Sequence, residues 1–323
     1  MIKRIWNLPK VDIQSFSSIE ERRPSLLITS LPAWNAVKSR LHLPIIQQLE
    51  ATEATTHHWD KLIASIESQD AQVVYAVGGG LTADAAKYIA VKLGLPMVCL
   101  PTALSVDAFL TAASGIRKEG CVYYIETKPP EHLILDLDVI SAAPEQIRAA
   151  GITDVMSIAT GCWDWKFAHQ QGQNPPGMEF IPWVYENARS ILNGVLDCAE
   201  AAGRGDVQGL KTLFDCLCME VQLCNQVGHA RPEEGSEHYF AYLVENFTGH
   251  GFPHGDLVGP GILLMAEKQH QNVQPLRQAL EACNIPLDNL SSEYIQRAIK
   301  DLPAYCRKHQ LPFGIAHDLE SGH

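Results

Sequence analysis

The chain has 323 residues, a length typical of two domains, and a formal net charge of −12 with a pI near 5.5. It has no cluster of Lys and Arg that would form a basic patch and no apolar run near the roughly 20 residues of a membrane span, so we expect no nucleic-acid or membrane partner. Residues 1–16 lack the apolar core of a signal peptide, and nine cysteines in a chain of this size favour a reducing compartment, so we expect a cytoplasmic protein.

The first half of the chain alternates short apolar runs with segments of helical spacing. The expected strands are 26–29, 44–46, 73–77 and 96–100, and the expected helices are 33–41, 56–67 and 83–93. Strands that alternate with helices indicate βαβ units and a parallel sheet. Residues 120–125 and 132–135 are expected to form a hairpin or strand pair, and 139–144 a junction.

After Pro144 the pattern is almost entirely helical, with Gly, Pro and Asn between the segments. The expected helices are 145–150, 153–170, 178–202, 207–227, 236–247, 257–269, 274–282 and 292–308. The predicted fold class is therefore an α/β N-terminal nucleotide-binding domain with a parallel sheet, over residues 1–142, followed by an all-α C-terminal domain over residues 143–323.

A glycine-rich turn joins the strand at 73–77 to the helix at 83–93. Gly78, Gly80 and Ala83 satisfy the G-x-G-x-x-G/A pattern of a dinucleotide turn. Such a turn presents backbone N–H groups at a helix N-terminus, where a phosphate is favoured, but glycine turns also join strands to helices without a ligand. Pro101-Thr102 follows the next strand, where the usual fingerprint has an acidic residue. We therefore interpret the glycines as a phosphate cradle placed later in the sheet.

Three places in the helical half carry side chains of the kind that bind metals. They are Gly151-Ile152-Thr153-Asp154, Gly235-Ser236-Glu237-His238 and Pro253-His254-Gly255-Asp256. Two imidazoles and one carboxylate leave open coordination positions, which suits a catalytic divalent ion. The alternative is that Asp154 only caps a helix, that His238 lies on the surface and that His254 is one loop histidine among 13.

Six stretches occur in one order between about residue 70 and residue 265: GGGLTADAAK (78–87), PTALSVDAFLTAAS (101–114), LILDLDVISAAP (133–144), AAGITDVMSIATGCWDWKFAH (149–169), RPEEGSEH (231–238) and PHGDLVGPGILL (253–264). Together they resemble the sn-glycerol-1-phosphate dehydrogenase family. That family is grouped with the iron-containing alcohol dehydrogenases, glycerol dehydrogenase and dehydroquinate synthase. The stretches WDWKFAH and RPEEGSEH favour the glycerol-1-phosphate branch over dehydroquinate synthase.

The resemblance implies a dehydroquinate synthase-like fold, with NAD or NADP bound by residues 1–142 and the metal and substrate bound by residues 143–323. It implies that Asp154, His238 and His254 bind one divalent metal, zinc being favoured over nickel or iron. Asp107 matches a position near the substrate and, with Asp154, is expected to be catalytic. Matches to the cofactor-binding positions of the family are Gly78, Gly79, Gly80, Asp84, Thr102, Ser105 and Thr111.

Two departures from the family concern ligand recognition. Tyr242 stands where the family often has a second His near the substrate, and we expect it to contact the substrate. Ser30-Leu31-Pro32 stands where the family often has an Asp for the adenosine ribose, so the choice between NAD and NADP is open.

Arg231 precedes the His238 ligand and is expected to bind a substrate phosphate through its guanidinium fork. The alternative is a surface Arg, or one that pairs with Glu233 or Glu234.

The predicted function is a metal-dependent NAD(P)-linked oxidoreductase that interconverts a small ketone and a polyol, with dihydroxyacetone phosphate and sn-glycerol 1-phosphate favoured. One alternative is a dehydroquinate synthase-like cyclase, a lyase that uses the same metal and NAD in a transient oxidation followed by elimination. Another is a non-catalytic relative that kept the fold. The expected partner is a small-molecule substrate, phosphorylated in the favoured case, and the sequence leaves the oligomeric state open, a homo-oligomer included.

Overall fold

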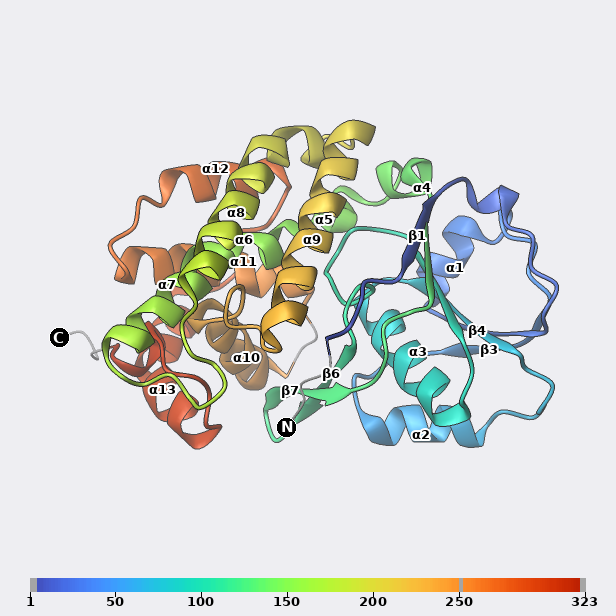
Figure 1. Cartoon of the computed structure of the whole chain (residues 1–323), viewed down its shortest axis with the longest axis horizontal. Helices are drawn as coiled ribbons and strands as arrows, with labels where there is room; N and C mark the ends of the chain where they lie inside the picture. Colours follow the sequence, from blue (N-terminus) through green and yellow to red (C-terminus); the bar gives the residue numbers. More distant parts are fainter. Residues whose placement is uncertain (1–4, 250–251, 320–323) are drawn as a thin grey trace. The chain divides into compact units, whose positions relative to one another are not determined.

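The structure is a computed structural model that describes residues 5–249 and 252–319. The chain divides into two compact units (Figure 1). The α/β unit comprises Trp6–Pro144, and the helical unit comprises the chain from Glu145 onward together with Ile5. This division falls two residues after the boundary predicted from the sequence. None of the helices among the described residues combines the length and the hydropathy that a membrane-spanning segment requires.

The α/β unit is built on a six-stranded parallel sheet with the order β1-β8-β5-β4-β2-β3. Its strands are β1 (Lys10–Ile13), β2 (Ser25–Thr29), β3 (Ile45–Glu50), β4 (Val73–Gly78), β5 (Met97–Pro101) and β8 (His132–Leu135). The chain runs from β2 outward to β3, returns to β4 on the other side of β2, and continues to β5. The order of strands therefore reverses between β2 and β4, the kind of place where open α/β sheets bind ligands.

The predicted pairing of residues 120–125 with 132–135 is wrong. β8 joins the main sheet between β1 and β5, and β7 (Cys121–Glu126) pairs antiparallel with β6 (Ala113–Lys118). β8 is a short apolar run whose last three residues are buried, as expected of a parallel strand covered on both faces. β6 was not predicted, because its sequence ASGIRK has no clear apolar alternation.

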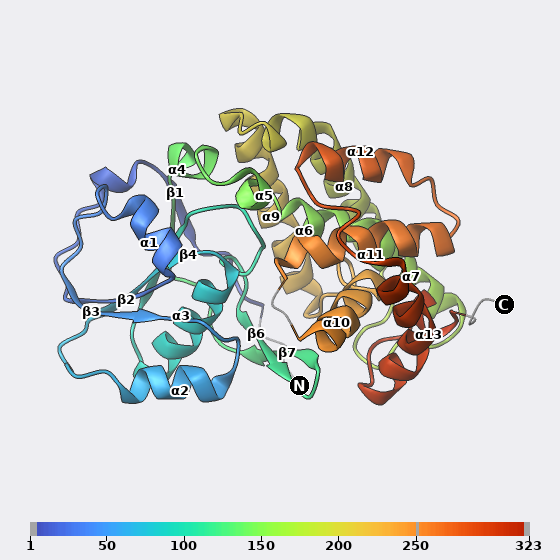
Figure 2. The ribbon, with the colours of Figure 1, turned by 180° about the vertical axis from the view of Figure 1, so that it is seen from behind.

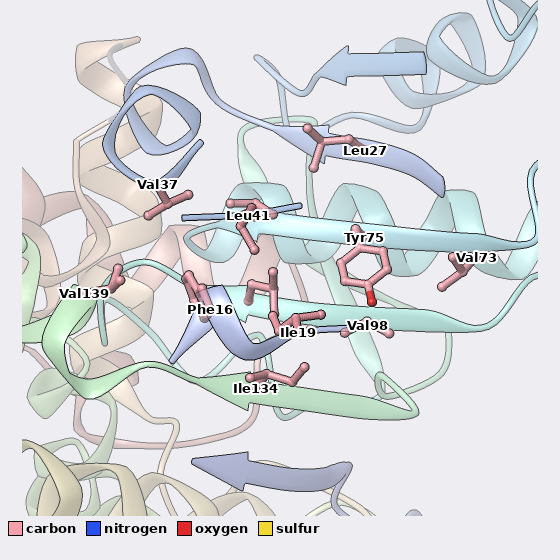
Figure 3. Close-up of a cluster of buried hydrophobic side chains, with 12 residues drawn as sticks. Phe16, Ile19, Leu27, Val37, Leu41, Val73, Tyr75, Val98, Ile134 and Val139 are labelled. Atoms are coloured by element: carbon pink, nitrogen blue, oxygen red, sulfur yellow. The ribbon is translucent and has the colours of Figure 1, made fainter. Parts of the chain in front are cut away.

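Helices cover both faces of this sheet. Figures 1 and 2 show α1 (Leu31–Val37) on one side and α2 (Thr56–Ala64) with α3 (Gly80–Leu93) on the other. Alternate residues of the central strands point to the α1 side and pack there against Phe16, Ile19, Val37 and Leu41 (Figure 3). The last helix of the unit is α4 (Leu137–Ser141). The sheet is therefore buried on both faces, which fixes the strand ends that carry the glycine turn.

The helical unit contains α5 (Glu145–Arg148), α6 (Ile152–Met156), α7 (Ile158–Gln170), α8 (Pro182–Gly203), α9 (Val207–Val227), α10 (Ser236–Thr248), α11 (His254–Lys268), α12 (Gln274–Ala282) and α13 (Ser292–Lys308). The predicted helix 153–170 is two helices that meet at Ser157. α11 begins at His254 rather than at Leu257, and α8 begins only at Pro182, whose ring suits the first turn of a helix. Long faces of α8 and α9, and of α10 and α11, pack against each other.

Candidate functional site

Three helices of the helical unit present the predicted metal ligands. Asp154 is the third residue of the short helix α6, His238 is the third residue of α10, and His254 is the first residue of α11. α11 packs against both α6 and α10, so the starts of these helices are held together. Pro253, the residue before α11, has a non-helical backbone with φ −52° and ψ 140°, so the helix begins at His254.

The three side chains converge. One donor atom from each of Asp154, His238 and His254 lies within 4.8 Å of the others. His254 Nε2 is 3.1 Å from Asp154 Oδ1, and the two imidazole rings have centroids 5.2 Å apart. Asp154 and His238 are buried and His254 is half-buried. The donor set and its spacing fit a divalent ion that keeps open coordination positions, while the role of these residues as ligands stays a prediction.

Glu237, the neighbour of His238, is a fully buried carboxylate beside this cluster. His238 Nδ1 lies 2.9 Å from its Oε1, and Thr160 Oγ1 donates to its Oε2 at 2.7 Å. Burial lowers the pKa of His238, but the hydrogen bond to Glu237 and the surrounding carboxylates raise this pKa by more than burial lowers it. The net result is a pKa raised to about 9. An ion that binds this imidazole must therefore displace a proton. Glu237 was not among the site residues predicted from the sequence, because an acidic residue in a first helical turn is common without a functional role.

Asp164, from the WDWK stretch on α7, is a second buried carboxylate that holds the same region. It accepts hydrogen bonds from Ser236 N at 2.8 Å and from Ile315 N at 2.9 Å, as well as from Gln269 Nε2 at 3.1 Å. Burial, together with the charge of Glu237, raises its pKa to about 6. Asp164 thus ties the first turn of α10 to the end of α11 and to the segment around Ile315.

The two predicted substrate residues of the helical unit lie near α10. The Tyr242 hydroxyl donates to Glu234 Oε1 at 2.8 Å, and the Tyr242 ring centroid is 6.1 Å from that of His238. Arg231 is buried, and its Nη2 donates to the carbonyl of Phe313 at 2.8 Å. This contact gives Arg231 a structural role. Contact of either residue with a substrate stays a prediction.

The predicted cofactor residues of the α/β unit gather where β4 and β5 end. Gly78 has a φ of 155°, a conformation that favours glycine, and Gly79 is the residue before α3. A Cβ on Gly79 would lie 3.1 Å from Ser105 Oγ, so the backbone of the turn approaches Ser105 closely. Thr102 N donates to Gly78 O at 3.2 Å. The turn therefore presents the N-terminus of a 14-residue helix at the reversal of strand order, as a phosphate cradle requires.

A fully buried lysine that was not among the predicted site residues contacts the segment that follows β5. Lys87 Nζ is 2.9 Å from Asp84 Oδ1 and donates to Ala108 O at 2.8 Å and to Thr111 Oγ1 at 3.0 Å. Burial raises the pKa of Asp84, and the Lys87 ammonium opposes this rise. Asp84 and Thr111 thus both contact the Lys87 ammonium group. Their contacts with a cofactor stay predictions.

Asp107 lies in the loop between β5 and β6. It is half-buried, and its backbone carbonyl accepts a hydrogen bond from Leu110 N at 2.7 Å. That bond closes a tight turn between Ser105 and Thr111. The loop therefore connects the two groups of predicted cofactor residues, and the catalytic and substrate roles of Asp107 stay predictions.

The chain is similar in sequence to proteins of known family. The sequence model of the iron-containing alcohol dehydrogenase family matches residues 27–144. The glycerol-1-phosphate dehydrogenase [NAD(P)+] of Pyrococcus furiosus is 30% identical over 236 residues, which are 72% of this chain and 66% of that protein. The enzyme of the same name from Pyrococcus horikoshii is 28% identical over 241 residues, 75% of this chain and 68% of that protein. The matched part of the chain spans about two thirds of the length of these relatives.

Solved structures show the same fold. A probable glycerol dehydrogenase from Sinorhizobium meliloti superposes with a TM-score of 0.71 at 19% identity, over 95% of this chain and 91% of that chain. The glycerol dehydrogenase of Schizosaccharomyces pombe superposes with a TM-score of 0.66 at 20% identity, over 92% and 83%. The sequence matches place the protein: it belongs to the iron-containing alcohol dehydrogenase superfamily, in the sn-glycerol-1-phosphate dehydrogenase branch.

Proposed function

We propose that the protein is a metal-dependent, NAD(P)-linked oxidoreductase that interconverts a small ketone and a polyol. The favoured pair is dihydroxyacetone phosphate and sn-glycerol 1-phosphate, the substrate class that the names of the relatives indicate. The observation that carries the proposal is the convergence of Asp154, His238 and His254 within 4.8 Å of one another. A reducing, cytoplasmic location is part of the proposal, and it is supported by the nine cysteines, which are all free thiols.

The helical unit is proposed to hold the metal and the substrate. When bound, a divalent ion stabilises negative charge on the substrate oxygen, and a nicotinamide exchanges a hydride with the substrate carbon. Asp154 supplies the negative charge that holds the ion, and the two imidazoles supply neutral nitrogen donors. Zinc is the ion that we favour, with nickel and iron as alternatives. Tyr242 and Arg231 are proposed to contact the substrate, together with Asp107 from the α/β unit.

The α/β unit is proposed to hold NAD or NADP. The backbone N–H groups of Gly78, Gly79 and Gly80 are offered to a pyrophosphate, because glycine has no side chain of its own to block the approach. The N-terminus of α3 also favours negative charge. Thr102, Ser105 and Thr111 add hydroxyl groups around the turn. Asp84 is proposed to contact the nicotinamide ribose.

A methyl group in this cradle should weaken cofactor binding. In Gly79→Ala the new Cβ lies on the turn, 3.1 Å from Ser105 Oγ, so it narrows the approach of a phosphate without requiring a forbidden backbone conformation. We expect the Michaelis constant for the reduced cofactor to rise by about 10-fold, or ~1.4 kcal/mol. The control is Gly194→Ala on α8, where the new Cβ meets Cys216 Sγ at an ordinary 3.4 Å. Equal Michaelis constants in the wild type and Gly79→Ala would exclude the turn as the cradle.

The function is tested by a cofactor-oxidation screen. Purified protein loaded with zinc, nickel or iron is given NADH or NADPH with dihydroxyacetone phosphate, dihydroxyacetone or glyceraldehyde. We expect net oxidation of the cofactor that depends on the metal and is fastest with dihydroxyacetone phosphate. A cyclase would regenerate its NAD and show no net change. Absence of net oxidation with every ketone and every metal would reject the proposed dehydrogenase.

A further inference from the structure

Glu237 occupies an unusual position for a charged residue. Its side chain has no exposed surface, yet it lies in the first turn of α10, directly before His238. Three groups of the protein surround its carboxylate: Gly235 N donates to Oε1 at 2.6 Å, His238 Nδ1 lies 2.9 Å from the same oxygen, and Thr160 Oγ1 donates to Oε2 at 2.7 Å. Both oxygens are therefore held, and the carboxylate cannot turn away from the imidazole.

The contact with Glu237 determines which ring nitrogen of His238 carries the proton. An ionised carboxylate only accepts hydrogen bonds, so the proton of the contact must be carried by Nδ1 of the ring. In the neutral imidazole the other nitrogen, Nε2, then has a free lone pair. Nδ1 is bound to Glu237, so Nε2 is the nitrogen left to join Asp154 and His254 in the cluster of donor atoms.

We propose that Glu237 is a positioning residue of the metal centre, which fixes His238 in the tautomer with the proton on Nδ1 and fixes the orientation of its ring. The inference rests on the metal centre of the proposed function. Carboxylates that accept the second N–H of a ligating histidine also raise its basicity as a ligand, and their removal typically weakens metal binding by about 10–100-fold. Thr160, from α7, acts on the ion only through Glu237.

A purely structural role makes a different prediction. An acidic side chain in a first turn stabilises a helix through the helix dipole, and Glu237 also satisfies the N–H of Gly235. If that were its whole purpose, loss of its charge would lower the stability of the metal-free protein and leave the affinity for the ion unchanged. The two roles are therefore separated by measuring the affinity and the stability in the same variants.

The test uses Zn²⁺ alone, with its dissociation constant measured by competition against a chromogenic chelator, and the melting temperature of the metal-free protein. Glu237→Gln keeps the size of the side chain and an acceptor oxygen but removes the charge. We expect its dissociation constant for Zn²⁺ to rise by about 10–100-fold. The control, Thr160→Val, removes the partner of Oε2 and leaves the contact with His238, so it should lose less affinity. In zinc-loaded wild type, ¹⁵N spectra of labelled histidine should show the His238 proton on Nδ1.

Three results would contradict the positioning role of Glu237 or the metal centre on which it rests. Wild-type affinity in a folded Glu237→Gln variant overturns the positioning role and leaves the metal centre intact. If that variant does not fold, Glu237→Asp keeps the charge but shortens the reach to Nδ1, and the same rise in the dissociation constant is expected, with wild-type affinity again contradicting the role. Failure of the wild type to bind Zn²⁺ overturns the zinc centre, and the positioning role inferred for it.

Discussion

Asp154→Asn is expected to remove stoichiometric metal from the protein and to abolish most of its activity. A neutral amide is a much weaker ligand for a divalent ion than a carboxylate, and Asp154 is the one carboxylate of the donor cluster. The loss of affinity should exceed the roughly 10–100-fold that follows removal of a hydrogen-bond partner of a ligand. Elemental analysis of the purified variant and its rate of cofactor oxidation measure the two effects.

The matched control for this variant is Asp256→Asn. Asp256 lies two residues after His254 on α11, is half-buried, and is outside the cluster of donor atoms. It should keep its metal and its turnover. A normal metal content in Asp154→Asn would remove Asp154 from the site, and with it the assignment of the three residues to one ion.

Lys87→Met is expected to destabilise the α/β unit strongly. The Lys87 ammonium has no exposed surface, is paired with Asp84 at 2.9 Å, and donates to the carbonyl of Ala108 and the hydroxyl of Thr111. Methionine has a similar length but no charge, so the Asp84 carboxylate would be left without its counter-ion. Breaking a buried pair in this way costs about 3–5 kcal/mol in the free energy of unfolding. Thermal and denaturant unfolding measure this loss.

Two further variants separate the charge from the shape of the side chain. Lys92→Met changes an exposed lysine of the same helix and should leave the unfolding free energy within about 0.5 kcal/mol of wild type. The double variant Lys87→Met with Asp84→Asn lacks both charges of this pair and should recover part of the loss. If Lys87→Met were no less stable than Lys92→Met, the ion pair would not hold the segment around Thr111.

Helices of the second unit could be predicted from the sequence because their signals are local. α9 and α13 have the predicted bounds, and each begins after a residue whose side chain caps the helix, Asp206 and Ser291. The strands were harder, since their pairing depends on distant segments. The run 132–135 was correctly expected to be extended, but its partners β1 and β5 lie far from it in the sequence. β1 itself is only four residues long and gives no clear pattern.

In the candidate site, too, some residues could be predicted from local sequence and others depend on distant segments. Asp154, His238 and His254 could be named because the surrounding stretches resemble a known family. Glu237, Asp164 and Lys87 could not be assigned roles, because a buried charge is recognised by its partners and each of these residues has partners that are remote in the sequence. Glu237 meets Thr160 across 77 residues and Asp164 meets Ser236 across 72 residues. Periodicity and composition carry no information about such contacts, which only the packed helices create.

Asp154, His238 and His254 are proposed to share one divalent ion. Anomalous diffraction at the zinc edge, from crystals of the zinc-loaded protein, tests it most directly. We predict one strong peak per chain, within about 2.0–2.2 Å of a carboxylate oxygen of Asp154 and of Nε2 of both histidines. A fully occupied zinc bound by other residues, with no peak among these three, would contradict it.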